Sequence, residues 1–289
     1  MVTYRIDQAY DYPITSESPV WSTYTSLEER IRACRVSDNL LAQMQTPALL
    51  ETILNYPLLV CMHAFGTIQE GMESVSSYFG GIEELCTRPD ALAVINSYYG
   101  MEIRKNDVEL TKIYLDALKE YILTQNSTYT YAFARSSTVT LLTEGGRRVT
   151  AYQDLTWSDH GTNLTTQERI ASDYLDEFPT ASRVASPSPK YNCHSYAWWT
   201  QSTSNRYWID NPHPFTVDGI YEEVSYRNAE IITYETSGGQ FVHSACYDGV
   251  VGGTVYVTSK WDECCVFRHA IDDCPYDAST DVYQGWARA

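Results

Sequence analysis

The hydrophobic period of this chain changes near residue 126, and this change limits the possible folds more than any other feature. Before it, the sequence carries repeated helix-start signals: Ser26 and Glu29 have the spacing of a capping box, and Thr46-Pro47 pairs an N-cap residue with a proline at the first helical position. Helical patterns follow at residues 48–55, 67–79, 82–86 and 90–99 and after the capping residue Asn106. These signals predict an α-helical domain over residues 1–125.

After residue 126 the pattern is that of strands. Residues 137–143 and 148–152 alternate apolar and polar side chains around a Glu-Gly-Gly turn, which predicts a β-hairpin. The capping-box spacing of Thr165 and Glu168 predicts a helix through residue 178, and strand patterns return at residues 231–235 and 241–247. We therefore predict an α+β protein whose second domain spans residues 126–289, with residues 126–185 leading into its main part.

The segment Tyr-Asn-Cys-His-Ser-Tyr-Ala-Trp-Trp at residues 191–199 contains the first candidate for chemistry. Pro187 and Pro189 precede it and no helix breaker follows, which predicts a loop that becomes a helix at or just before Cys193. The positive end of the helix dipole favours a thiolate over a thiol, and a thiolate attacks carbonyl carbon. Cys193 is therefore a candidate nucleophile; the alternative is a small buried cysteine in an aromatic core helix.

A histidine fifty residues later strengthens the first interpretation. His243 lies near the start of the alternating segment 241–249. A cysteine on a helix followed by a histidine on a strand is the order used by papain-like cysteine peptidases, in which the imidazole is the general base. The sequence therefore predicts a Cys193–His243 dyad.

Four motifs resemble one known family. NCHSYAWW, VHSACY, VTSKW and CPY, which together cover about the last third of the chain, resemble bacterial secreted proteins of the NlpC-type papain-like cysteine peptidase superfamily. The helical region resembles one that precedes the peptidase-like domain in those proteins. The sequence departs from the family pattern at Ala229-Glu230, where relatives carry Gly-Asp, and at Asp262, where relatives carry glycine.

This resemblance implies a fold, an activity and a location. It implies a nucleophile helix packed on an antiparallel sheet, and a cysteine peptidase or amidase that hydrolyses a peptide or isopeptide amide, with cell-wall peptides as the substrate class. It also implies an extracellular protein whose signal peptide is absent from the sequence given. Two alternatives remain open: a secreted binding module whose peptidase fold has lost activity, and an acyltransferase that uses the same dyad.

The residue that orients the imidazole is predicted from hairpin geometry. Residues equidistant from a turn centred near residue 251 face each other, so His243 is expected opposite position 259, give or take one. Ser259 can accept a hydrogen bond through its hydroxyl, whereas the ammonium of Lys260 cannot. We predict Ser259 as the third catalytic residue. Lys260 and His269 remain alternatives, the latter because relatives carry a histidine ahead of the CPY motif.

Further site residues are predicted from their position beside the dyad. Tyr191, Asn192, Trp198 and Ser244 are expected to bind substrate. The backbone amide of Cys193 is the expected oxyanion donor if the helix begins there.

Composition excludes several partners and cofactors. A net charge of −17 argues against nucleic acid as the partner. The sequence contains no run of eighteen apolar residues, so we predict no membrane span. The cluster Cys264-Cys265-x₃-His269-x₄-Cys274 offers four possible zinc ligands, but adjacent cysteines do not readily share a tetrahedral metal. We therefore predict no metal and no cofactor, with a peptide or cell-wall substrate as the partner. The oligomeric state stays open.

Overall fold

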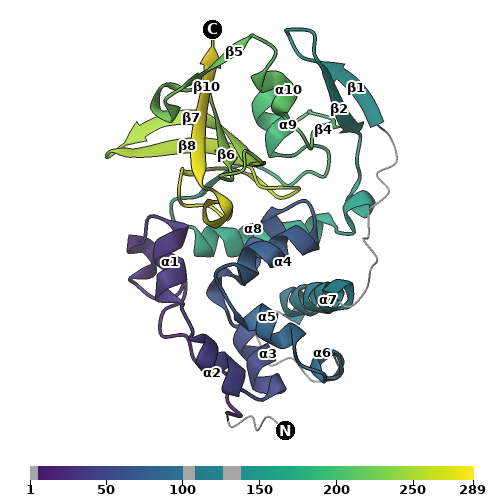
Figure 1. The fold of residues 1–289 in the computed structure, drawn as a ribbon, viewed down its shortest axis with the longest axis vertical. Helices are drawn as coiled ribbons and strands as arrows, with labels where there is room; N and C mark the ends of the chain where they lie inside the picture. Colours follow the sequence, from purple (N-terminus) through teal and green to yellow (C-terminus); the bar gives the residue numbers. More distant parts are fainter. Residues whose placement is uncertain (1–5, 100–107, 126–137) are drawn as a thin grey trace. The chain divides into compact units, whose positions relative to one another are not determined.

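The computed structural model describes residues 6–99, 108–125 and 138–289. It confirms a mixed α+β protein with an N-terminal helical region and antiparallel sheets (Figure 1). The chain divides into two compact units: residues 1–24 with 28–131, and residues 25–27 with 132–289.

The first unit is helical. Its described helices are η1 (Trp21–Thr23), α1 (Leu27–Ala33), α2 (Asp38–Gln43), α3 (Thr46–Leu54), η2 (Pro57–Ala64), α4 (Ile68–Ser76), α5 (Gly81–Cys86), α6 (Ala91–Tyr98) and α7 (Val108–Gln125). The predicted cap at Asn106 lies outside the described residues. Thr46 is the first residue of α3 rather than its cap, and its hydroxyl donates to the carboxylate of Asp90 at 2.7 Å.

The helical core includes a close contact between α4 and η2. Gly71 of α4 lies against the backbone of Met62, so that a Cβ atom on Gly71 would come within 1.9 Å of the Met62 carbonyl oxygen. Met62 and Met72 are both fully buried beside this contact. Only glycine allows α4 and η2 to approach this closely.

The second unit is built on two antiparallel sheets. The smaller sheet has the order β1 (Thr138–Leu142), β2 (Arg148–Gln153), β4 (Tyr207–Trp208). The larger has the order β3 (Ser182–Ala185), β9 (Val266–Ala270), β8 (Thr254–Lys260), β7 (Phe241–Val251), β6 (Ile231–Glu235), β10 (Val282–Arg288), β5 (Tyr221–Val224). The helices of the second unit are η3 (Trp157–His160), α8 (Leu164–Glu177), α9 (Cys193–Trp198), α10 (His213–Thr216), η4 (Tyr226–Asn228) and η5 (Asp277–Ser279).

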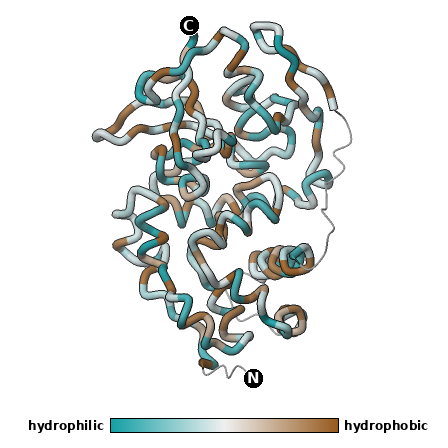
Figure 2. Tube along the Cα trace, in the orientation of Figure 1, coloured by the Kyte–Doolittle hydropathy of each residue, from teal (hydrophilic) through white to brown (hydrophobic). Residues whose placement is uncertain are grey.

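Helices cover both faces of the large sheet, and its central strands are therefore buried on both sides. On one face, Trp198 of α9 joins a cluster that includes Cys246 and Val266. On the other face, Tyr174 of α8 packs edge-on against Phe267, with ring centroids 6.1 Å apart. The adjacent residues Val266 and Phe267 thus serve opposite faces, as strand alternation requires. Figure 2 shows how apolar and polar residues interleave along these strands.

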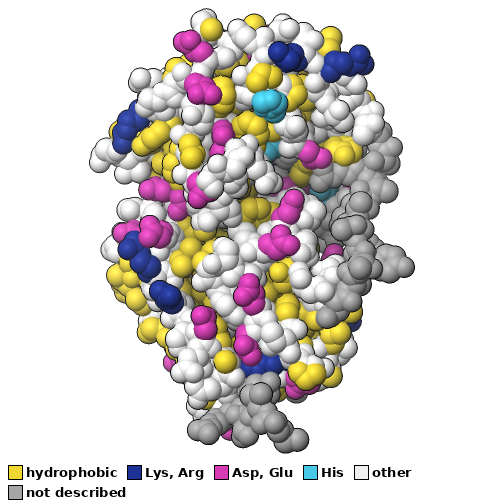
Figure 3. Space-filling view, in the orientation of Figure 1, with side chains coloured by type: hydrophobic (Ala, Val, Ile, Leu, Met, Phe, Trp, Pro, Cys, Tyr) yellow, Lys and Arg dark blue, Asp and Glu magenta, His cyan; other side chains and the backbone are white. Residues whose placement is uncertain are grey.

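Acidic side chains are visible on the surface of the protein. On the face drawn in Figure 3, acidic side chains are dispersed rather than gathered in one patch. None of the described helices is both long enough and apolar enough to cross a membrane.

The contact at Gly71 generates the first prediction. Gly71→Ala should destabilise the protein by about 1–3 kcal/mol, because the new methyl group meets backbone that cannot move aside. At an exposed helix position the same change would stabilise by about 1 kcal/mol. Thermal unfolding followed by far-UV circular dichroism measures the effect. Gly238→Ala is the control. A Cβ atom at residue 238 would meet only Thr236 Oγ1, at 3.7 Å, so this substitution should leave the melting temperature unchanged. Equal melting temperatures for the two variants would contradict the packing.

Candidate functional site

The helix start at Cys193 is fixed by the buried side chain of Asn192. Its Oδ1 accepts hydrogen bonds from the backbone N–H groups of Ser195 at 3.1 Å and Ile209 at 3.3 Å, and its Nδ2 donates to the Ile209 carbonyl at 2.8 Å. Cys193 is therefore the first residue of α9, as predicted. Asn192 caps the helix and ties it to the segment before α10.

The Cys193 sulfur receives two backbone hydrogen bonds but lies in a buried environment. Burial raises the pKa of the Cys193 thiol to about 12, and the Asp262 carboxylate acts in the same direction. The N–H groups of Ser244 and His194, which donate to the sulfur, and the ammonium of Lys260 lower this pKa, but their effect is smaller. The expected thiolate is therefore not the resting form: burial outweighs the dipole of a six-residue helix.

His243 points to the opposite face of the sheet from α9. The hydroxyl of the next residue, Ser244, meets α9 through His194 Nδ1 at 2.8 Å and Trp198 Nε1 at 3.1 Å. Because successive strand residues face opposite ways, the imidazole of His243 lies on the other side. There it stacks on Tyr276, with ring centroids 3.7 Å apart and planes 11° from parallel.

The imidazole of His243 is fully buried, and neither of its ring nitrogens makes a hydrogen bond with the described residues. Burial, with smaller contributions from His269 and His194, holds the pKa of His243 well below its usual value. The predicted hydrogen bond between Cys193 and His243 is therefore not formed, and the imidazole is neutral.

The predicted pairing of His243 with Ser259 is wrong, because the β7–β8 turn lies further along the chain than predicted. Val251 pairs with Thr254, so the turn is centred between Gly252 and Gly253 rather than near residue 251, and further along the hairpin Cys246 pairs with Thr258. Continuing the register of Cys246 and Thr258 towards His243 places that residue across from position 261, rather than 259.

Ser259 is bonded to His269 instead. Ser259 Oγ lies 2.8 Å from His269 Nε2 and also accepts from Trp261 Nε1 at 3.1 Å. His269 Nδ1 lies 2.8 Å from the Ala270 carbonyl, which can only accept, so Nδ1 carries the proton and Nε2 accepts from the Ser259 hydroxyl. Burial lowers the pKa of His269 to about 4. Neither alternative for the third residue hydrogen-bonds His243.

The four predicted substrate-binding residues are all buried. Tyr191 stacks near Tyr196, with ring centroids 6.3 Å apart, while Asn192, Trp198 and Ser244 make the contacts described above. Their contacts hold α9 on the sheet, and their role in binding substrate stays a prediction.

Two residues have structural roles that the sequence did not predict. Lys260 is fully buried, and its ammonium donates to the carbonyls of Ser188, Asp262 and Cys264 at 3.1, 2.5 and 2.7 Å. Burial lowers the pKa of Lys260 to about 8. The second residue, His194, joins α9 to β7, and burial lowers its pKa to about 4. The only sequence signal for Lys260 was a charged residue at the end of a buried strand.

The cysteine-rich C-terminal cluster is not arranged for a metal. The adjacent residues Cys264 and Cys265 hydrogen-bond each other through their side chains, and Cys264 Sγ also donates to the Gln167 carbonyl at 3.6 Å. Within residues 6–99, 108–125 and 138–289, no group of three or more His, Cys, Asp or Glu side chains could hold a metal ion. The eight cysteines are free thiols.

Comparison with models of protein families, with curated proteins and with solved structures found no match. The resemblance to NlpC-type peptidases therefore depends on the motifs quoted above.

The buried histidines predict acid sensitivity. Between about pH 4 and the usual histidine pKa, His194 and His269 stay neutral in the folded protein but bind protons when it unfolds. The unfolded state then binds more protons, so stability is lost as pH falls from 6.5 towards 4, by up to about 3 kcal/mol for each ring.

Urea unfolding at several pH values between 7 and 4.5, followed by tryptophan fluorescence, measures this loss. Of the seven tryptophans only Trp21 lies outside the second unit, so the signal reports mainly on the histidines' own unit. His269→Asn should reduce the pH dependence by up to about one proton. His213→Asn, which removes an exposed ring, should leave it unchanged. Identical pH profiles for wild type and His269→Asn would refute the assignment.

Proposed function

We propose that this chain is a cysteine-dependent hydrolase of NlpC-type, papain-like architecture that cleaves a peptide or isopeptide amide. The observation that carries the proposal is the pair of backbone N–H groups, from His194 and Ser244, directed at the sulfur of a cysteine that begins a helix. Hydrogen bonds of this kind stabilise a thiolate once the site opens. The motif resemblance supports the same class, with cell-wall peptides as substrates and an extracellular location.

The roles of the residues follow from their chemistry. Cys193 attacks the amide carbonyl, and its own N–H, at a helix start where no intrahelical acceptor is available, serves the oxyanion. His243 takes the thiol proton and later returns it to the leaving amine. An imidazole with both nitrogens unpaired in the interior costs about 1–3 kcal/mol, which favours a functional role for His243 over a packing role.

The proposed reaction requires a local movement. The sulfur accepts from the N–H of Ser244, so it lies beside the peptide unit that joins His243 to Ser244. Rotation of the His243 side chain away from Tyr276 would bring the two reacting groups together across that single peptide unit. We propose that substrate binding selects this rotated state.

A second candidate function is supported by the burial of the site. Cys193, His243 and all four predicted substrate-binding residues are buried, as expected of a peptidase fold that has become a binding module. An acyltransferase would use the same dyad but pass the acyl group to an amine. Turnover on a library of peptides and isopeptides, with and without added amines, separates the three functions by their products.

Thiol labelling tests the nucleophile without a substrate, and Cys246 is its internal control. Cys193 and Cys246 are each 7% exposed, and burial raises the pKa of both thiols to about 12. If His243 activates Cys193, iodoacetamide should label Cys193 about tenfold faster than Cys246 at neutral pH, one pKa unit being a tenfold change in thiolate. Global unfolding exposes both thiols equally and cannot produce this ratio.

The variants assign the base. His243→Ala should bring the ratio of labelling rates, measured by peptide mass spectrometry, close to one, whereas Ser259→Ala should leave it unchanged if Ser259 serves only His269. Equal labelling of Cys193 and Cys246 in the wild-type protein would exclude the proposed nucleophile. A ratio lost in His194→Ala but kept in His243→Ala would move the base to the helix histidine.

A further inference from the structure

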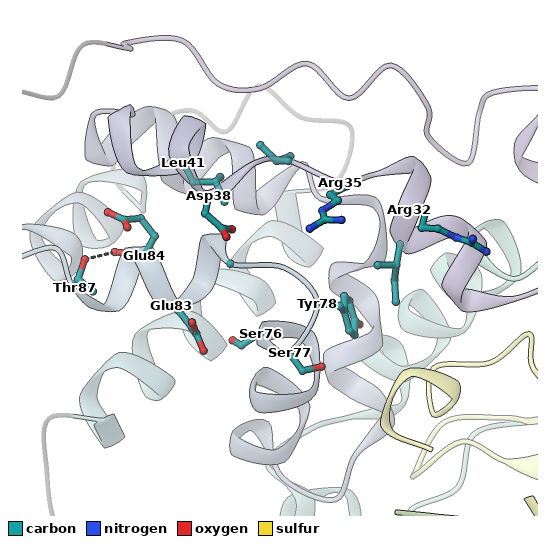
Figure 4. Close-up of a pocket in the computed structure, with 13 residues that line it drawn as sticks. Arg32, Arg35, Asp38, Leu41, Ser76, Ser77, Tyr78, Glu83, Glu84 and Thr87 are labelled. Atoms are coloured by element: carbon teal, nitrogen blue, oxygen red, sulfur yellow. Dashed lines mark hydrogen bonds between the residues drawn. The ribbon is translucent and has the colours of Figure 1, made fainter. Parts of the chain in front are cut away.

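The helical unit contains a cavity of about 680 Å³ that the proposed function does not use. It lies between α1, α2, the end of α4 and α5 (Figure 4). Its volume falls within the range of small-molecule sites, about 300–1,000 Å³. Its wall combines apolar side chains, among them Val36 and Leu41, with charged side chains of both signs.

The charges in this cavity are not paired with each other. Arg35 and Asp38 both reach into it (Figure 4), yet neither forms an ion pair or a side-chain hydrogen bond with any described residue. The Asp38 carboxylate rests on Gly80, where a Cβ atom would come within 2.7 Å of Asp38 Oδ1. Glu83 adds a second carboxylate beside Ser76, and it too has no ion pair among the described residues.

The frame that holds these charges is fixed by Arg88. Its guanidinium donates to the carbonyls of Leu41 at 3.3 Å and Met44 at 3.0 Å, at the end of α2, and pairs with Glu84 of α5 at 2.7 Å. The Arg88 side chain is 1% exposed, so this clamp is shielded from water. It joins two walls of the cavity and neutralises Glu84, which leaves the solvent-exposed side chains of Arg35, Asp38 and Glu83 at its mouth available to a ligand.

We propose that this cavity binds a small zwitterion of the class of a short peptide with free termini. The ligand carboxylate pairs with Arg35, and its ammonium group lies between Asp38 and Glu83. Guanidinium is the side chain best suited to bind a carboxylate. A ligand of a single charge would leave the opposite charge of the wall facing it, so the arrangement favours a zwitterion. This proposal does not rest on the chemistry of Cys193.

Calorimetric titration of the full chain with the dipeptide alanyl-leucine tests the proposal. Binding should weaken about tenfold or more when either terminus is blocked, as in N-acetyl-alanyl-leucine and alanyl-leucine amide, because each block removes one charge-assisted contact. Arg35→Gln and Asp38→Asn should each weaken binding of the free dipeptide by a similar factor. Two control variants remove charges at exposed helix positions outside the cavity: Lys112→Gln removes a positive charge, as Arg35→Gln does, and Glu70→Gln removes a negative charge, as Asp38→Asn does. Each control should change affinity less than about twofold.

The variants also assign the ends of the ligand. Arg35→Gln should bind the free dipeptide and its amide equally, and Asp38→Asn should bind the free and acetylated forms equally. Far-UV circular dichroism checks that each variant is folded. Three results would overturn the proposal: no binding of alanyl-leucine at millimolar concentration, blocked peptides that bind as well as the free one, or affinity that both cavity variants leave unchanged.

Discussion

A single buried ammonium holds together the segments that frame the candidate nucleophile. Lys260, the last residue of β8, donates to the carbonyl of Ser188 in the loop before α9 and to those of Asp262 and Cys264 in the turn after β8. Its three N–H donors match these three acceptors, so the charge is buried without an unused proton. Loss of the ammonium would leave three carbonyls to find new partners, at about 1–3 kcal/mol for each that stayed buried and unpaired. This arrangement ties the loop that leads to Cys193 to the end of β8.

Burial keeps the candidate nucleophile and the three histidines around it uncharged. Two amide donors and a nearby ammonium favour the Cys193 thiolate, yet the pKa of the thiol is raised because the low-dielectric interior disfavours any charge more strongly. The same effect keeps His194, His243 and His269 neutral. In the proposed mechanism, the uncharged cysteine and histidine are the resting state of the site. Entry of water or of a polar substrate would reverse the balance, because the fixed N–H groups are already directed at the sulfur.

The sequence predicted what depends on local chemistry. The period of apolar residues distinguished helices from strands, and the prolines before Cys193 marked the start of α9 at the correct residue. Local alternatives of similar strength were harder to separate: α8 is capped by Asn163, whose Oδ1 accepts from the N–H of Thr166, rather than by Thr165.

Features set by distant residues were not predictable. The β7–β8 register is not one of these features: it was missed because the turn lies at Gly252-Gly253, between the paired residues Val251 and Thr254, rather than near residue 251. The short strands β3 and β4 exist through pairing with β9 and β2, which are distant in sequence. The role of Lys260 likewise became visible only when three carbonyls from two separate segments were brought together.

In the proposed mechanism, a small energy difference at His243 separates the resting state from the reactive state. In its observed position the imidazole gains the stack on Tyr276 and an edge contact with Tyr234, whose ring centroid is 5.1 Å away, but both of its nitrogens are unpaired. An aromatic pair contributes about 0.5–1.5 kcal/mol, and a hydrogen bond to Cys193 would contribute about as much. Rotation would therefore exchange two aromatic contacts, about 1–3 kcal/mol together, for one hydrogen bond that also satisfies a buried nitrogen, which contributes about as much. A substrate that binds the rotated state only modestly better is enough to shift the population, since each 1.4 kcal/mol of differential affinity changes the ratio of the two states by about tenfold.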